Sequence, residues 1–273
     1  MGFKIGIVGL PNVGKSTLFN ALTKTASAQA ENFPFCTIEP NIGEVAVPDN
    51  RLHALSKIAA SKQVIPSRMT FVDIAGLVKG ASKGEGLGNQ FLANIREVDA
   101  IAHVVRCFEN EDVAHIEGRV DPVADAETID TELMLADIDS IERRLQGLSR
   151  KVRGGDKEAV QQERLLKRAL SSLEEGKPAR QVMVDVEDAC AWKSLQLLTT
   201  KPVLFVCNVG ETEAADGNEY SAKVDAIALE EGAVTVIISA QIEEEISQLD
   251  PEEAAIFLND MGITETGLDR LIR

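Results

Sequence analysis

The chain has 273 residues, of which 44% are hydrophobic, and a formal net charge of -16. This size and hydrophobic content suffice for a core in one large domain or two modest ones. The negative charge argues against binding nucleic acid or anionic membrane over the whole surface, and no run approaches the roughly 18 apolar residues that a membrane helix needs.

The N-terminal residues lack the apolar stretch and cleavage site of a secretory signal, and Gly6 stands where a myristoylation signal requires Ser or Thr. The four cysteines show no CxxC spacing, so we expect reduced thiols rather than a metal site. They are Cys36, Cys107, Cys190 and Cys207. Together these observations predict a cytoplasmic protein.

A glycine-rich loop follows the first apolar run. The run Phe3–Val8 is typical of a strand, and GLPNVGKST, Gly9–Thr17, leads from it into a helical pattern. The GxxxxGKS spacing at a helix N-terminus leaves backbone N–H groups free to surround phosphates. Lys15 would place a charge against the outer phosphates, and Ser16 would offer its hydroxyl to Mg²⁺. The residues expected to contact a nucleotide here are Asn12, Val13, Gly14, Lys15, Ser16 and Thr17.

The next segment, Phe33–Gly43, is interrupted by prolines and is interpreted as a loop. Within it, Thr37 is expected to ligate Mg²⁺ when a γ-phosphate is present and to release it after hydrolysis, as in nucleotide switches. The alternative is a loop threonine that bonds only to its own backbone. The flanking motifs favour the switch role.

The second half of a metal site is expected at FVDIAG, Phe71–Gly76. Asp73 ends an apolar strand and would hold Mg²⁺ through water, while Gly76 would donate its N–H to a γ-phosphate. Many phosphate-loop proteins carry next a Gln that orients the attacking water, but here the residue is Leu77. Slow hydrolysis is therefore expected. The further glycines up to Gly88 predict either a lid that reorganises with the γ-phosphate or a plain loop.

The histidines differ in their expected surroundings. His103 falls in the apolar run Ala100–Cys107, and His53 falls in a surface helix. His115 follows in a loop after Phe108 and is free to approach a γ-phosphate, so it is the candidate catalytic histidine. The alternative is an exposed loop histidine without a role.

An insertion is expected between about Pro122 and Thr200, where β-rich runs stop and charged helical patterns begin. Two stripes of apolar residues, separated by Gly154-Gly155, predict an antiparallel helical coiled-coil hairpin. The alternative is that both stripes pack on the sheet domain. The stripes are Ile138, Ile141, Leu145, Leu148 and Val152, then Ala159, Leu166, Ala169 and Leu173.

The tip of this predicted hairpin is basic. From Arg143 to Arg168 there are nine Lys or Arg against three Asp or Glu, in an otherwise acidic chain. Such a charge balance is compatible with a plain solvated face and also with contact to RNA or an acidic protein.

The base-binding side is expected after the run Pro202–Cys207, where the sequence continues as Asn208, Val209, Gly210 and Glu211. GTPases usually carry NKxD here, with the Asp accepting two hydrogen bonds from guanine. Here Val209 replaces the Lys and the longer Glu211 replaces the Asp, which weakens guanine recognition and favours ATP. Ser239 and Ala240, after the run Ala233–Ile238, are expected to support the base through backbone N–H groups.

Strands that alternate with helices predict an α/β fold with a mostly parallel sheet covered by helices on both faces. With the motifs at Gly9–Thr17, Phe33–Gly43 and Asp73–Leu92, the chain closely resembles the YchF subfamily of Obg-related P-loop NTPases, the Obg-like ATPases. The resemblance implies a Ras-like nucleotide-binding domain with an inserted hairpin, Mg²⁺-dependent hydrolysis of ATP in preference to GTP, and association with ribosomes. Asn12 is similar to an asparagine that coordinates K⁺ in some related NTPases, although it is equally compatible with a turn-stabilising role.

The resemblance also sets the expected domains: a nucleotide-binding domain over 1–121 and 200–273, and a helical insertion over 122–199. Family members continue into a small C-terminal TGS domain, which is expected to be absent here. Two other functions remain open at this point. One is a GTPase with a tolerant base pocket, and the other is a non-hydrolysing, nucleotide-dependent adaptor that acts through the hairpin.

Overall fold

The computed structural model describes residues 2–30, 42–74, 87–110 and 119–272. In this part of the chain, six strands form one sheet in the order β2-β3-β1-β4-β5-β6. Neighbouring strands are parallel except for the β2–β3 pair, which is antiparallel. The mostly parallel sheet predicted from the sequence is confirmed. The strands are β1 (Phe3–Val8), β2 (Ile42–Ala46), β3 (Arg68–Asp73), β4 (Ala100–Arg106), β5 (Val203–Asn208) and β6 (Val234–Ile238).

Helices connect the strands and form the insertion. Within the described residues, none of them is long and apolar enough to cross a membrane. The α-helices are α1 (Lys15–Ala30), α2 (Asn50–Ala59), α3 (Leu87–Arg96), α4 (Pro122–Arg153), α5 (Lys157–Glu174), α6 (Ala189–Ser194), α7 (Glu219–Glu231), α8 (Ala240–Ile246), α9 (Pro251–Asp260) and α10 (Gly267–Ile272). The 3₁₀ helices are η1 (Ala179–Gln181), η2 (Val186–Asp188), η3 (Leu198–Thr200) and η4 (Glu211–Glu213).

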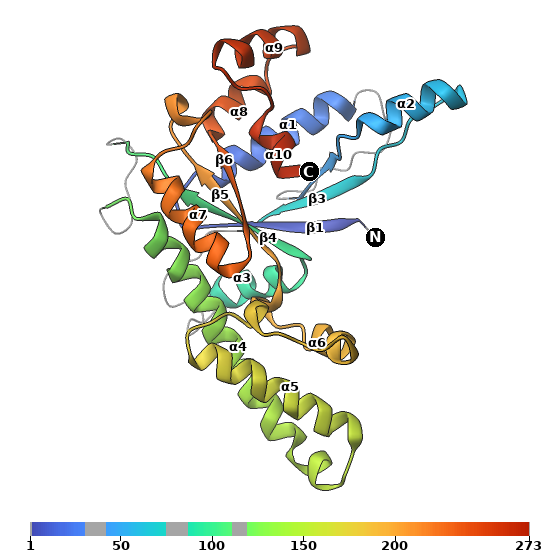
Figure 1. Cartoon of the computed structure of the whole chain (residues 1–273), viewed down its shortest axis with the longest axis vertical. Coiled ribbons are helices and arrows are strands. Elements are labelled where there is room, and N and C mark those ends of the chain that lie inside the picture. Colours follow the sequence, from blue (N-terminus) through green and yellow to red (C-terminus); the bar gives the residue numbers. More distant parts are fainter. Residues whose placement is uncertain (1, 31–41, 75–86, 111–118, 273) are drawn as a thin grey trace.

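The sheet is covered on both faces. Figure 1 shows α1, α8 and α10 on one side of it and α3, α4 and α7 on the other, while α2 extends away from the sheet. The central strand β4 is buried along almost its whole length, which explains why its sequence is mostly apolar rather than alternating. The main core therefore lies on both faces of the sheet, around residues such as Ile7, Phe71, Ile101 and Phe205.

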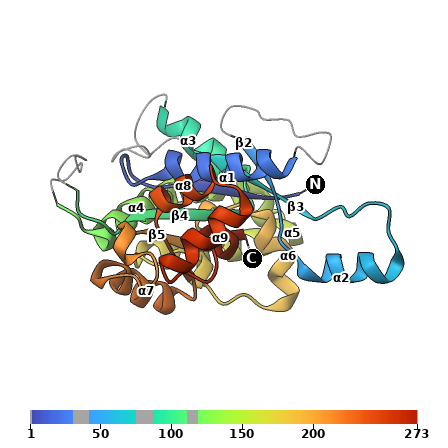
Figure 2. The ribbon, with the colours of Figure 1, turned by 90° about the horizontal axis from the view of Figure 1, so that it is seen from above.

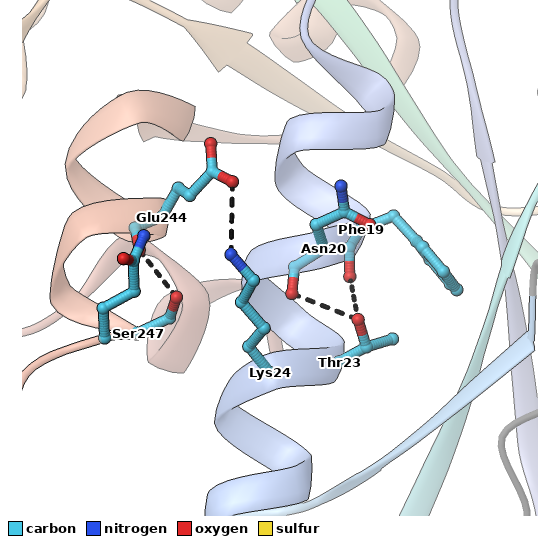
Figure 3. A network of polar contacts seen from close by, with 7 residues as sticks. Phe19, Asn20, Thr23, Lys24, Glu244 and Ser247 are labelled. Carbon is cyan, nitrogen blue, oxygen red and sulfur yellow. Dashed lines mark hydrogen bonds and ion pairs between the residues drawn. The ribbon is translucent and has the colours of Figure 1, made fainter.

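Helices α1 and α8 lie side by side in both views (Figures 1 and 2). An exposed ion pair joins them, with Lys24 Nζ 3.4 Å from Glu244 Oε1. Figure 3 shows this pair beside Thr23, whose hydroxyl donates back to the carbonyl oxygens of Phe19 and Asn20 in α1. The helix that begins at the glycine-rich loop is thus packed beside the helix that begins at Ala240.

The inserted hairpin is confirmed, and it projects away from the sheet (Figure 1). Local sequence explains its ends. Asp121 caps α4 by accepting the N–H of Ala124, and Asp156 caps α5 by accepting the N–H groups of Glu158 and Ala159. Between the helices the chain reverses at Gly154-Gly155.

A second, separate cluster of buried apolar residues holds the hairpin together. It contains residues from both predicted stripes and from the segment that returns to the sheet. The fully buried members are Ile141, Leu165, Leu166, Ala169, Leu173, Ala179, Leu195 and Leu197.

Helix α4 belongs to both cores. Its first half contributes Ala126, Ile129, Leu133 and Ala136 to the main core, and its second half packs against α5. The buried members of the two predicted stripes pack together in the hairpin, as expected, and the part of α4 that packs on the sheet domain precedes the first stripe. Along α4, the residues up to Ala136 pack in the main core, and later residues pack in the hairpin core. The expected domain boundary at residue 122 remains a prediction.

Candidate functional site

The glycine-rich loop runs from the end of β1 to the start of α1 and takes the conformation of a cradle. Gly14 has a positive φ of 98°, and Asn12 has a φ of 64°, in the left-handed region that Asn tolerates better than most residues. A Cβ on Gly9 would lie 2.4 Å from the carbonyl oxygen of Val104 in β4, so only glycine fits there. The left-handed backbone gives Asn12 a role in the turn, and K⁺ binding by Asn12 stays a prediction.

Lys15, Ser16 and Asp73 meet beside this loop. Lys15 is buried, and its Nζ donates to the carbonyl oxygen of Leu10 at 2.7 Å, which holds the ammonium inside the loop. Asp73 reaches the same place because β3 pairs with β1 in a register that sets Asp73 opposite Ile7. The phosphate loop and the end of β3, separated by more than fifty residues in sequence, are thereby brought together as predicted.

Burial controls the electrostatics of this group. It lowers the pKa of Lys15 and raises the pKa of Asp73, while the attraction between the two opposes both shifts. A hydrogen bond with Ser16 also opposes the rise in the pKa of Asp73. Lys15 therefore provides a poorly hydrated positive charge where a polyphosphate would lie.

The residues also fit a magnesium ion. Within the described part of the chain, Oδ1 of Asp73 is buried and has no hydrogen-bond partner. A buried carboxylate oxygen without a partner is costly unless a proton, water or cation satisfies it. With the Ser16 hydroxyl beside it, Asp73 offers the oxygen ligands that Mg²⁺ prefers.

Asn208 joins the phosphate loop to the opposite side of the site. Its Nδ2 donates to the carbonyl oxygen of Val13 at 2.9 Å, and its Oδ1 accepts the N–H of Ala240 at 2.9 Å. A Cβ on Gly14 would lie 2.3 Å from the same Nδ2. The Asn208 side chain therefore fixes the two loops relative to each other, and binding of a base by Asn208 remains a prediction.

The other residues expected at the base lie around Asn208. Val209 is buried in the main core, and its N–H donates to the carbonyl oxygen of Ile238 at 2.8 Å. Glu211 is exposed in η4, while Ser239 and Ala240 are buried. The predicted loops converge, but the N–H of Ala240, expected to face the base, is already bonded to Asn208.

A cavity that sequence reasoning missed lies beside this loop. It has a volume of about 520 Å³ and opens between the end of β4, η4 and the N-terminus of α7. Phe108 contributes an aromatic side chain, and its position two residues after the end of β4 was the available signal, because ligands bind where parallel strands end. The lining residues are Phe108, Glu109, Gly210, Thr212, Glu213, Asn218, Glu219 and Tyr220.

Three predicted catalytic or metal-binding residues lie outside the described residues: Thr37, Gly76 and His115. Their roles, and the consequence of Leu77, stay predictions. His103, expected in a buried strand, is fully enclosed and stacks on Phe205 with ring centroids 5.4 Å apart. Burial lowers the pKa of His103 to about 3, so the ring is neutral and belongs to the core.

Two of the three cysteines within the described residues lie in the core, as expected of core thiols, and the third does not. Cys107 and Cys207 are buried, Cys190 is exposed, and none forms a disulfide. Cys36 lies outside the described residues. The pKa of the Cys107 thiol is raised mainly by a hydrogen bond with Cys207 and also by burial, so the thiol stays protonated.

The sheet order, the glycine cradle and the Lys15–Asp73 pair define a P-loop nucleoside triphosphatase domain with a Ras-like fold. A family model described as "50S ribosome-binding GTPase" matches residues 4–139. The solved structure of the Schizosaccharomyces pombe YchF GTPase superposes with a TM-score of 0.86 at 36% identity, covering 99% of this chain and 74% of that one.

Curated relatives are similar over the full length of the chain. "Ribosome-binding ATPase YchF" of Haemophilus influenzae is 56% identical, and the proteins of the same name from Escherichia coli O157:H7 and Bacillus subtilis are 52% and 50% identical. In each case the match covers 100% of this chain and 75% of the relative. The chain belongs to the YchF family.

Proposed function

We propose that this chain binds and slowly hydrolyses ATP with Mg²⁺, and that its nucleotide state governs contact with the ribosome in the cytoplasm. The observation that carries the proposal is the group formed by Lys15, Ser16 and Asp73, where the glycine cradle meets the end of β3. The bacterial relatives named ribosome-binding ATPases support both parts of the proposal.

Each residue has a distinct part in the reaction. The amides of the loop hold the phosphates, and Lys15 stabilises the negative charge that develops on the β- and γ-phosphates. Ser16 and Asp73 would hold Mg²⁺, Asp73 through water, and when bound the ion neutralises phosphate oxygens. Thr37 and Gly76 would complete the γ-phosphate contacts. Because Leu77 cannot orient water, turnover is slow, and His115 is the candidate substitute.

The preference for ATP is a separate part of the proposal, because the printed names differ: the curated bacterial relatives are called ATPases, and the Schizosaccharomyces pombe protein is called a GTPase. One feature favours adenine over guanine: Val209 and exposed Glu211 do not reproduce the Lys and Asp that bind guanine. The cavity beside Gly210 is large enough for a purine of either kind and offers the ring of Phe108 for stacking.

The basic hairpin tip is the proposed ribosome contact. Several of its basic side chains are bonded within the insertion, including Arg164 to Asp188 and Arg168 to the Met183 carbonyl. Within the described residues, the side chains of Arg150, Lys151, Arg153 and Lys157 at the turn have no hydrogen bond or ion pair. These four remain available for phosphate groups of RNA.

Calorimetric titration with ATP and GTP, followed by phosphate release with Mg²⁺ in K⁺ or Na⁺ buffer, tests the proposal. We expect tighter binding of ATP, slow release of phosphate, and faster release in K⁺ if Asn12 holds that ion. Lys15→Ala should lower turnover by at least about 100-fold, since it removes charge stabilisation at the transferred phosphate.

Lys24→Ala is the matched control, because Lys24 lies in the same helix but pairs with Glu244 at the surface. It should leave turnover unchanged. Tighter binding of GTP would overturn the base assignment. Nucleotide binding without any phosphate release, in K⁺ as well as Na⁺, would instead support the non-hydrolysing adaptor.

A further inference from the structure

Glu243 is a buried carboxylate outside the residues assigned above. It lies in the first turn of α8, is 4% exposed, and its Oε1 accepts the N–H of Gly267 at 2.7 Å. The N–H of Leu268 also bonds to this carboxylate, so Glu243 caps the N-terminus of α10 from another helix. Among the described residues its Oε2 has no hydrogen-bond partner.

Helix α10 is packed tightly against the end of β6. A Cβ on Gly267 would lie 2.1 Å from Cγ1 of Ile238, so only glycine allows this approach. One turn later, Nη2 of Arg270 donates to the carbonyl oxygen of Ile237 at 3.0 Å. The end of β6, which leads directly into Ser239, is therefore held from one side by α10.

Glu243 connects this contact to the base side of the nucleotide site. The N–H of Glu243 donates to the carbonyl oxygen of Ser239 at 3.0 Å, which forms the first turn of α8. Ala240, which follows Ser239, donates its N–H to Oδ1 of Asn208. Fixing the Glu243 carboxylate on α10 thus fixes the turn that presents Ser239 and Ala240.

The phosphate side has supports of its own. Lys15 is bonded to Leu10 within the loop, and the N–H of Leu18 donates to the carbonyl oxygen of Gly14 at 3.0 Å to start α1. These two bonds do not pass through α8, and the loop is linked to the start of α8 through Asn208, which bonds both Val13 and Ala240. Loosening α8 should therefore disturb the base side more than the phosphate side.

We propose that Glu243 is a positioning residue that holds the Ser239–Ala240 loop against Asn208 and thereby determines how well the site discriminates between nucleobases. The inference rests on the proposed function, and it also uses the sequence-based prediction that Ser239 and Ala240 support the base. It predicts that base selection depends on a contact between two helices that do not themselves touch the nucleotide.

The test compares ATP, GTP and tripolyphosphate as ligands of Glu243→Ala. Loss of the hydrogen bonds to Gly267 and Leu268 should weaken ATP binding about tenfold or more and bring the ATP and GTP affinities closer together, while tripolyphosphate affinity changes less than about twofold. Glu243→Gln retains an oxygen for Gly267 and should bind ATP within about threefold of the wild type.

Glu244→Ala is the matched control. Glu244 is the next residue of the same helix, but it is exposed and pairs with Lys24 at the surface (Figure 3). Its removal should leave all three affinities unchanged. If Glu243→Ala does not fold, Glu243→Asp makes the same test, because its shorter side chain cannot reach Gly267.

An unchanged ratio of ATP to GTP affinity in the Glu243 variants would overturn the inference, as would an equal loss for all three ligands. If the wild-type chain bound none of the three, the proposed function itself would fail, whatever the variants did. The two failures are therefore distinguishable.

Discussion

At the scale of single residues, the Gly14–Asn208 contact is the tightest constraint on the phosphate loop. Gly14→Ala would place a Cβ 2.3 Å from Asn208 Nδ2, at a φ of 98° that alanine disfavours, and Asn208 cannot move without losing Val13 and Ala240. We expect a loss of about 1–3 kcal/mol in the free energy of unfolding and at least about a tenfold loss in ATP affinity, measured by urea denaturation and calorimetry.

The control for this substitution is Gly147→Ala. Gly147 lies inside α4, and a Cβ there would meet nothing within 4 Å. Alanine should stabilise the helix by up to about 1 kcal/mol and leave ATP binding unchanged. Wild-type affinity in Gly14→Ala would show that the loop tolerates the side chain.

Glu243 also predicts a pH dependence of stability. Burial raises its pKa to about 7 from an unfolded value near 4.5; Asp269 adds to the rise, while the Gly267 and Leu268 amides and Arg270 oppose it. The folded state thus prefers the protonated form. The contribution of Glu243 to the free energy of unfolding is fully present below pH 4.5 and is lost as the pH rises through 7.

The total change should be at most about 3 kcal/mol. Glu243→Gln removes the titrating group, so urea denaturation at about pH 5 and about pH 8 should show a smaller difference for this variant than for the wild type. Equal pH dependence in both proteins would contradict the assignment.

Some site residues could be predicted from the sequence and others could not, for a physical reason. Lys15, Ser16 and Asp73 were predictable because phosphate and metal chemistry demand those residue types next to a strand end. The link between Asn208 and Val13 joins residues 195 positions apart, and no local pattern encodes such a contact. Glu243 was missed because a buried carboxylate on a short acidic helix looks like a solvated one in the sequence.

At the scale of elements, a buried ion cluster connects the insertion to the sheet domain. Arg180 in η1 bonds Asp130 in α4 at 2.8 Å and Glu231 in α7 at 2.5 Å, and all three side chains are at most 15% exposed. Burial alone would lower the pKa of Arg180, but Asp130 and Glu231 raise it. The cluster thus joins three elements through one always charged side chain.

Arg180→Met keeps the volume but leaves two buried carboxylates unpaired, so it should lower the free energy of unfolding by about 3 kcal/mol. Adding Asp130→Asn and Glu231→Gln should recover part of this loss. Urea denaturation followed by Trp192, the single tryptophan, and by circular dichroism measures both. The control Lys177→Met, in an exposed pair, should cost less than about 0.5 kcal/mol. A similar loss of unfolding free energy for both substitutions would mean that the buried cluster stabilises the fold no more than an exposed ion pair does.

The hairpin was predictable because its apolar residues recur at helical spacing on both sides of a glycine pair. The division of α4 between two cores was not. Ala126 to Ala136 and Ile138 to Leu148 continue one helical stripe, and the stripe does not reveal which partner covers each half. That choice depends on where the sheet ends, which is a property of the assembled fold.

At the scale of the whole molecule, charge is distributed so that the turn of the projecting hairpin is basic while the chain as a whole is acidic. The chain carries a net charge of -16, yet the turn of the projecting hairpin carries Arg150, Lys151, Arg153 and Lys157 (Figure 1). An acidic body repels RNA phosphates at long range, whereas a basic tip on a projecting arm would approach them first. This arrangement favours contact through the tip alone.

The salt dependence of the proposed ribosome binding tests this arrangement. Changing Arg150, Lys151 and Arg153 together to Gln should weaken binding at every salt concentration. It should also reduce the slope of log affinity against log salt concentration by about two to three, because fewer phosphate contacts form and fewer counterions are released on binding. The matched control changes Arg143, Lys167 and Arg168 to Gln, which removes the same charge from side chains that are bonded within the insertion. It should alter the slope by less than about one. Equal effects of the two triple variants would mean that the total charge of the hairpin, rather than its tip, sets the affinity.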